Sequence, residues 1–282
     1  MEPLVSTAWL AAQLDASDLV VLDASAHLPD AQRDAAAEFA AAHIPGARFL
    51  DLKSLVDPAS PVPAAIPTRE QFAAAMGKLG VTQQSRVVLY DDSYVKTAAR
   101  AWFVFRHYGL SEVAVLDGGL AKWRSEGRAV ETGQTTGMAA AEFVAEGGAG
   151  DVRSKAEMLA NLDTRAEQVV DARGAKRFTG EEADFRPEVA PGHIPGSRNV
   201  PFDKVLNPDG TYKDADAIRA TFAEAGVDLD RPLVTSCGGG VTAAVLLFAL
   251  HLIGKHDVAL YDGSWAEWGT DPATPKALGL AA

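Results

Sequence analysis

Two kinds of hydrophobic pattern alternate along this chain. Short apolar runs rich in β-branched residues, typical of buried strands, lie at residues 19–22, 86–90, 113–116, 168–170, 233–235 and 258–261. Stretches with helical spacing of apolar residues lie between them, at residues 69–79, 96–108 and 215–225. Strands that alternate with helices usually form a parallel sheet with helices on both faces. The pattern therefore predicts an α/β fold, with functional loops at the carboxyl ends of the strands.

The chain also repeats its own landmarks. A His-Ile-Pro-Gly segment begins at His43 and again at His193. An Asp-Gly turn followed by Trp occupies residues 117–123 and returns at residues 262–268. Matched landmarks in the same order, at a spacing longer than solenoid repeats, indicate two copies of one folding unit. We therefore predict domains at residues 1–132 and 151–282, joined by a linker at residues 133–150 that is rich in Gly, Thr and Ala.

The single cysteine, Cys237, directly follows a predicted strand and begins a glycine-rich loop. Glycines let successive backbone N–H groups curl into an anion-binding nest, and the next helix adds unpaired N–H groups at its N-terminus. This setting favours a thiolate or persulfide anion, so we predict that Cys237 is a nucleophile; the alternative is a small buried side chain in a turn. The predicted cradle for the charged sulfur is Gly238, Gly239, Gly240, Val241 and Thr242.

Two other cysteine chemistries fit less well. A protein phosphatase of this loop type needs Arg six residues after the cysteine, where this chain has Ala243. A cysteine protease needs a partner histidine, and nothing in the sequence pairs one with Cys237. In the first copy, an alignment of Arg86 with Arg231 places Asp92 opposite Cys237, without the glycines. Only the second copy is therefore predicted to be catalytic.

Composition narrows the classes of partner. Of the 282 residues, 48% are hydrophobic and 23% charged, and the net charge of −12 comes with scattered Lys and Arg. A surface for nucleic acid or anionic membrane would need a basic cluster, so neither partner is expected. The first residues lack the pattern of a secretory signal, and the longest apolar run, 241–253, is too short to span a membrane. One cysteine excludes an internal disulfide and a Cys-based zinc site, so a reducing cytoplasm fits best.

These motifs together resemble the tandem-domain rhodanese family, and within it the 3-mercaptopyruvate sulfurtransferases. The resemblance covers nearly the whole chain and rests on the doubled His-Ile-Pro-Gly segment, the Asp-Gly turns followed by Trp, and the loop from Cys237 to Thr242. It implies two rhodanese-like domains, each a mostly parallel sheet with helices on both faces. It also implies that Cys237 takes sulfur from 3-mercaptopyruvate as a persulfide, releases pyruvate, and passes the sulfur to a thiol, cyanide or a thioredoxin-like protein. No metal or other cofactor is implied.

The same resemblance assigns further residues. Arg177 and Arg186 match the family's substrate-binding arginines, and a guanidinium fork suits a carboxylate beside a carbonyl. His43 and Asp34 match members of a triad proposed for relatives with a loop hydroxyl. Here Gly239 replaces that hydroxyl, which favours a structural turn for both His-Ile-Pro-Gly histidines.

Two rival functions remain open at this point. One is a thiosulfate sulfurtransferase, whose loops carry two cationic side chains where this chain has Gly238 and Gly239. The other is a non-catalytic sulfur-binding or scaffold protein built from a rhodanese-like pair.

Overall fold

The chain forms two compact units in a computed structural model that describes residues 1–135, 140–148 and 150–281. The first unit comprises Met1–Asp57, Ile66–Gly148 and Pro208–Tyr212. The second comprises Pro58–Ala65, Ala149–Asn207 and Lys213–Ala282. The change of unit after residue 148 falls within the predicted linker, of which residues 136–139 and 149 lie outside the described residues.

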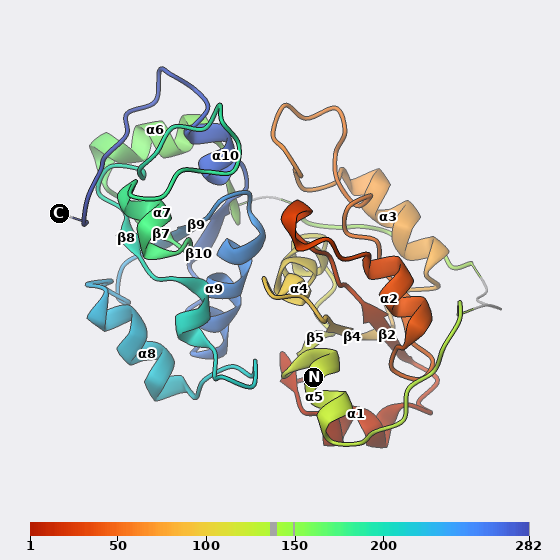
Figure 1. The fold of residues 1–282 in the computed structure, drawn as a ribbon. Helices are drawn as coiled ribbons and strands as arrows, with labels where there is room; N and C mark the ends of the chain where they lie inside the picture. Colours follow the sequence, from red (N-terminus) through yellow and green to blue (C-terminus); the bar gives the residue numbers. More distant parts are fainter. Residues whose placement is uncertain (136–139, 149, 282) are drawn as a thin grey trace. The chain divides into compact units, whose positions relative to one another are not determined.

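The first unit is built on a five-stranded parallel sheet in the order β1-β5-β4-β2-β3, flanked by helices (Figure 1). Its strands are β1 (Leu4–Val5), β2 (Leu19–Asp23), β3 (Arg48–Phe49), β4 (Arg86–Tyr90) and β5 (Val113–Leu116). Its helices are α1 (Thr7–Gln13), the 3₁₀ helix η1 (Pro29–Ala31), α2 (Ala35–Ala41), α3 (Arg69–Lys78), α4 (Thr97–His107) and α5 (Gly119–Ser125).

The second unit repeats this topology, with a parallel sheet in the order β6-β10-β9-β7-β8. Its strands are β6 (Val152–Arg153), β7 (Gln168–Asp171), β8 (Arg198–Asn199), β9 (Leu233–Ser236) and β10 (Val258–Tyr261). Its helices are α6 (Lys155–Thr164), α7 (Ala175–Thr179), the 3₁₀ helix η2 (Phe202–Val205), α8 (Ala215–Glu224), α9 (Val241–Leu252) and α10 (Ser264–Trp268). The predicted α/β class, the duplication and the six central strands are confirmed, the strands to within one residue.

Burial explains why the central strands read as continuous apolar runs. Residues 113–116 of β5 and 258–261 of β10 are buried throughout, because parallel strands are covered on both faces. Helix α9 lies against β9 and β10, and every residue from 243 to 250 is buried. It is the buried helix that its apolar sequence predicts. No helix in the described part of the chain is long and apolar enough to cross a membrane.

The described part of the predicted linker is packed rather than extended into solvent. Phe143 is buried and meets the ring of Phe72 edge-on, with ring centroids 5.5 Å apart. The N–H of Ala141 donates to the Gly77 carbonyl at 3.0 Å, and the N–H of Glu146 donates to the Tyr108 carbonyl at 3.1 Å. Residues 140–148 therefore extend the core of the first unit.

Strand register gives the equivalence between the two halves. Asp23 pairs with Tyr90 in the first sheet, and Asp171 pairs with Ser236 in the second. Tyr90 and Ser236 are therefore equivalent, and so are the residues that follow them, Asp91 and Cys237. The alignment with Asp92 is wrong by one position. Its cause is the choice of anchor, because the strand register makes Arg86 equivalent to Pro232 and not to Arg231. The loops that follow also differ in length: five residues separate Asp91 from α4, whereas three separate Cys237 from α9.

Candidate active site

Cys237 follows the last residue of β9 and precedes α9 by three glycines. Its side chain is buried, with 2% of its surface exposed. The third glycine, Gly240, caps α9 with a φ of 78°, a left-handed conformation that glycine adopts without the usual steric cost. The strand, the tight glycine turn and the helix thus bring the sulfur to the carboxyl edge of the sheet, beside a helix N-terminus.

Ser264 ties the two ends of this loop together. Its Oγ accepts the N–H of Cys237 at 3.1 Å and the N–H of Gly240 at 3.2 Å, and it donates to the Tyr261 carbonyl at 2.8 Å. The same Oγ lies 4.0 Å from Cys237 Sγ. Ser264 is fully buried and has a φ of 48°, a left-handed backbone conformation that is strained for serine. The surrounding contacts hold the residue, and therefore its hydroxyl, in this conformation.

Part of the predicted cradle is available to an anion. Within the described residues, the N–H groups of Gly238 and Gly239 make no hydrogen bond, and the first-turn N–H groups of Val241 and Thr242 have no intrahelical acceptor. The N–H of Gly240 donates instead to Ser264. Four of the five predicted cradle residues therefore present N–H groups that a charged sulfur can use.

The first unit holds an anion of its own at the equivalent position. The Asp91 carboxylate accepts the N–H of Ala98 at 2.6 Å and that of Ser93 at 3.2 Å. Burial nevertheless raises the pKa of Asp91 to about 6, although Lys96 and these N–H donors oppose the shift. Burial therefore outweighs Lys96 and the backbone donors at this position, and nearby positive charge would favour a buried sulfur anion in the second unit.

That charge comes from Arg177 and Arg186, which share one carboxylate. Asp184, with 3% of its side chain exposed, forms ion pairs with both guanidiniums. Arg186 binds it through Nε at 2.8 Å and Nη2 at 3.1 Å, and Arg177 binds it through Nη2. Two cations around one anion leave a net charge of +1.

The shared carboxylate is an ion at any ordinary pH. Burial acts to raise the pKa of Asp184, but the hydrogen bonds and charge of Arg186, together with the charge of Arg177, lower it to about 2. Its stabilising contribution is therefore complete above the ordinary pKa of an aspartate and is lost only as the pH falls toward 2. The arginine pair keeps its anchor across the neutral range.

The arginine pair faces Gly238, the residue directly after Cys237. Arg186 Nη2 donates to the Gly238 carbonyl at 3.3 Å. A Cβ added at Gly238 would lie 3.7 Å from Arg177 Nη2 and 4.0 Å from Arg186 Nη2, whereas a Cβ at Gly239 would meet nothing within 4 Å. The predicted substrate residues Arg177 and Arg186 and the loop after Cys237 are thus brought together in one unit.

This asymmetry gives a matched pair of variants. We expect Gly238→Gln to lower kcat/KM at least about tenfold, because its amide would fill the space before both guanidiniums and bond to them in place of a donor carboxylate. Gly239→Gln points into open space and should change kcat/KM less than about threefold. Steady-state kinetics on both variants measure the difference, and equal losses would contradict this placement of the donor.

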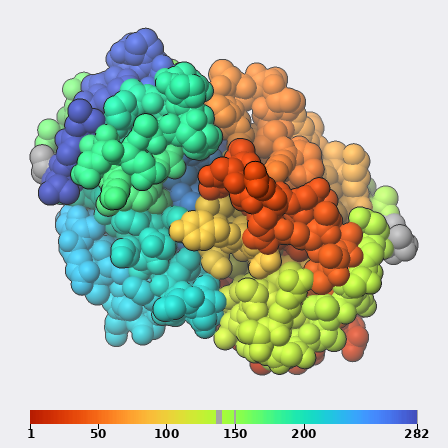
Figure 2. All heavy atoms as spheres, viewed as in Figure 1, coloured from red at the N-terminus to blue at the C-terminus, as the bar shows by residue number. Residues whose placement is uncertain are grey.

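The two His-Ile-Pro-Gly histidines have the same role in both units. His43 stacks on Phe39 with its Nδ1 2.8 Å from that residue's carbonyl, and His193 does the same with Phe178 at 2.9 Å. Each also forms a two-way backbone bridge, to Glu131 and to Ala277. In Figure 2 the dark blue C-terminal segment accordingly packs on the green segment of the second unit. These contacts fit the interpretation as a structural turn.

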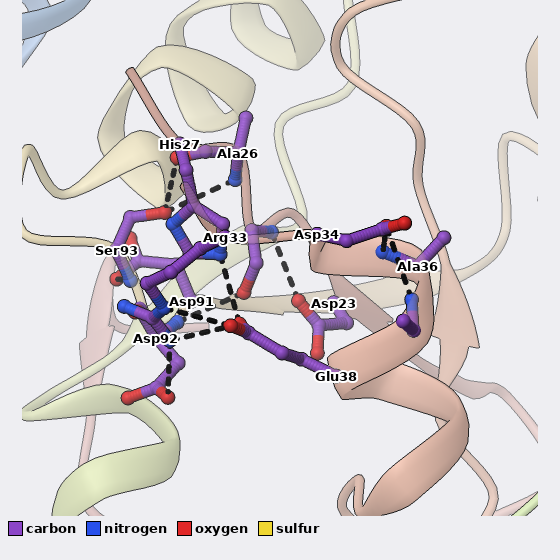
Figure 3. Close-up of polar contacts among 12 residues, drawn as sticks. Asp23, Ala26, His27, Arg33, Asp34, Ala36, Glu38, Asp91, Asp92 and Ser93 are labelled. Atoms are coloured by element: carbon purple, nitrogen blue, oxygen red, sulfur yellow. Dashed lines mark hydrogen bonds and ion pairs between the residues drawn. The ribbon is translucent and has the colours of Figure 1, made fainter. Parts of the chain in front are cut away.

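Asp34 has a separate structural contact. Its carboxylate accepts the N–H groups of Ala36 and Ala37 at 3.0 and 3.2 Å and caps α2 (Figure 3). The ring of His43 is bonded at the other end of that helix, to the Phe39 carbonyl. The two residues matched to a triad therefore each have a local partner of their own.

Sequence reasoning missed a buried ion pair at the end of β7. Arg173 Nη2 binds Asp171 at 2.6 Å and the Gly192 carbonyl at 2.8 Å, and its guanidinium lies over the ring of Trp265, 4.6 Å from the centroid. The backbone N–H of Trp265 in turn donates to the Cys237 carbonyl at 2.9 Å. The pair braces the strand end beside the loop that begins at Cys237.

No metal site is found among the described residues. They contain no group of three or more His, Cys, Asp or Glu side chains that could hold a metal ion.

Known proteins resemble nearly the whole chain. The family model of the rhodanese-like domain matches twice, at residues 6–126 and 154–271. The mouse protein named 3-mercaptopyruvate sulfurtransferase is 42% identical, over 94% of this chain and 91% of its own. Chicken thiosulfate sulfurtransferase is 41% identical, over 94% of this chain and 92% of its own. The crystal structure of SseA from Escherichia coli superposes with a TM-score of 0.83 at 36% identity, and covers 94% of this chain and 99% of that one.

The chain therefore belongs to the rhodanese family. It is an enzyme of the sulfurtransferase class, built from two rhodanese-like domains.

Proposed function

We propose that this enzyme takes sulfur from 3-mercaptopyruvate. The Cys237 thiolate attacks the donor's sulfur, and the bond between that sulfur and carbon breaks. The bonding electrons leave with the carbon as the enolate of pyruvate, which takes a proton from solvent, and the sulfur remains on Cys237 as a persulfide. The free N–H groups of the loop stabilise the charged sulfur in both steps. An acceptor thiolate or cyanide then attacks the outer sulfur and restores the Cys237 thiolate.

The observation that carries this proposal is the arginine pair anchored by Asp184 next to Gly238. A planar guanidinium can hold a carboxylate and its neighbouring carbonyl at once, so Arg177 and Arg186 would fix the pyruvyl part of the donor and aim its sulfur at Cys237. The net charge of +1 from the pair and Asp184 matches a single carboxylate. The proposed site residues are therefore Cys237, its loop, Arg177 and Arg186.

Thiosulfate is the second candidate donor, favoured by the chicken relative, which is named for it. A compact dianion needs more positive charge close to Cys237 than one net cation supplies. We therefore expect 3-mercaptopyruvate to be preferred by at least about tenfold in kcat/KM, or about 1.4 kcal/mol of transition-state binding. Steady-state rates with each donor and a common acceptor measure the preference.

One variant sharpens the comparison. Gly239→Lys adds a cation where a side chain meets no obstacle, and it should shift the preference toward thiosulfate. Equal or better use of thiosulfate by the wild type would show that the arginine pair suffices for a dianion. Turnover with either donor would remove the alternative of a non-catalytic sulfur-binding scaffold.

The remaining assignments are extensions of this proposal. Residues 1–132 would act as the non-catalytic domain, since Asp91 has no transferable sulfur. The acceptor would be a small thiol, cyanide or a thioredoxin-like protein. A cytoplasmic location would agree with the single cysteine, which fits a reducing compartment, whereas one relative from Arabidopsis thaliana is named as mitochondrial.

A further inference from the structure

A pocket lies within the first unit. It has a volume of about 280 Å³. It lies where β2 and β4 end, and Figure 3 labels four of its charged lining residues, Asp23, Arg33, Glu38 and Asp92. Its lining includes Ser25, Leu120 and five charged side chains. These are Asp23 at the end of β2, Arg33, Glu38, Asp92, and Arg124 from α5.

The second unit fills the equivalent place with a side chain of its own. There the Arg173 guanidinium pairs with Asp171, donates to the Gly192 carbonyl and stacks on Trp265. Asp171 ends β7 as Asp23 ends β2, and both accept the N–H of the residue two positions later, at 2.9 Å. A bound cation at a buried carboxylate is thus part of this domain's architecture.

The first unit keeps the carboxylate and lacks the cation. Ser25 is equivalent to Arg173, because each lies two residues after the equivalent aspartates at the strand ends. Leu120 is equivalent to Trp265, because the backbone N–H of Leu120 donates to the Asp91 carbonyl as that of Trp265 donates to the Cys237 carbonyl. Both replacements are smaller, and both line the pocket. Asp23 is buried, and its carboxylate has neutral hydrogen-bond partners in Ser25 and Tyr90; in the described part of the chain it forms no ion pair. Burying a carboxylate without a cation is costly.

The two arginines of the pocket do not supply the missing partner. Arg33 is held by Glu38 at 2.7 Å and by Asp92 at 3.0 Å. Within the described residues, the hydrogen bond of Arg124 goes to the Ala42 carbonyl, at 3.4 Å, which is the counterpart of the Gly192 carbonyl that binds Arg173. Three carboxylates and two guanidiniums line the pocket, so their formal charges sum to −1.

We propose that this pocket binds a small organic cation with a guanidinium head, which pairs with Asp23 as the Arg173 side chain pairs with Asp171. The planar head can form two parallel hydrogen bonds to the Asp23 carboxylate, and the volume beside Ser25 and Leu120 is that vacated by the Arg173 and Trp265 side chains. The ligand's charge cancels the net charge of the lining. Burial also raises the pKa of Asp23, and a bound cation would lower it again.

The test is a titration of the full-length protein with methylguanidinium at constant ionic strength, followed by NMR chemical shifts. The expected result is saturable binding to one site, with a weaker response to methylammonium, which lacks the planar fork. Asp23→Asn keeps an oxygen for the Ser25 N–H but loses the charge, and it should weaken binding at least about tenfold. Ser25→Arg supplies the cation from the chain and should abolish binding.

Asp15→Asn is the matched control, because it removes the same charge from an exposed turn outside the pocket and should leave affinity unchanged. The proposal is overturned if the wild type shows no saturable binding, if Asp23→Asn binds as the wild type does, or if methylammonium binds as tightly. Should Asp23→Asn fail to fold, Ser25→Arg alone decides: retained binding would place the cation elsewhere.

Discussion

Cys237→Ser should abolish sulfur transfer while the fold remains intact. A serine hydroxyl fits the same space, but it is far less acidic and less nucleophilic than a thiol, so neither the attack on the donor nor the persulfide can form. Intact-protein mass after treatment with 3-mercaptopyruvate should show one added sulfur on the wild type and none on the variant. Because Cys237 is the chain's single cysteine, no other thiol can contribute to the signal.

Thermal unfolding provides the control for this variant. A melting temperature near that of the wild type would show that the loop still forms around Ser264. Substantial turnover by a folded Cys237→Ser protein would exclude Cys237 as the sulfur carrier.

Loss of either active-site arginine should lower kcat/KM for 3-mercaptopyruvate by one to two orders of magnitude. A hydrogen bond to a charged group contributes about 1.5–3 kcal/mol, and poor aim of the donor's sulfur adds to that loss. Arg177→Met and Arg186→Met are suitable variants because they keep most of the side-chain volume. Arg186→Lys keeps the positive charge but loses the planar guanidinium fork, so its kcat/KM should lie between those of Arg186→Met and the wild type.

The losses of transition-state binding energy caused by the two arginine substitutions should not be additive. Both guanidiniums bind Asp184, so removal of one changes the position of the other, and the double variant should lose less than the sum of the single losses. Wild-type specificity constants in both single Met variants would mean that the donor binds in another loop.

The sequence sufficed for the central architecture because its signals are strong and local. Six apolar runs and a doubled set of motifs predicted both sheets and the duplication. The two-residue strands β1, β3, β6 and β8 at the sheet edges are too short for any periodicity to mark them. Their places follow only from the strands with which they pair.

The residues predicted for the site lie together in the structure, but most of their contacts could not be predicted from the sequence. Cys237, Arg177 and Arg186 could be matched to known motifs, but the anchoring role of Asp184 depends on a chain reversal that brings it between two arginines. The signal for this contact in the sequence was an acidic residue, Asp184, two positions before Arg186. Ser264 was visible within a repeated turn, yet its bonds to the loop depend on a strained φ that a sequence pattern does not report. The one-residue error at Asp92 arose because two arginines near the strand starts, Arg86 and Arg231, were aligned although the register places Arg86 opposite Pro232.

The unequal length of the loops after Asp91 and Cys237 limits how the two halves can change over evolution. Replacing Asp91 by cysteine would place a thiol at the right strand position, but five residues would still separate it from α4, where the catalytic half has three. A shortened loop, new glycines and a pair of anchored arginines would all have to arise as well. Point substitution alone cannot exchange the roles of the halves, so the first half is free to accumulate changes, including those that open its pocket, without acquiring competing sulfur chemistry.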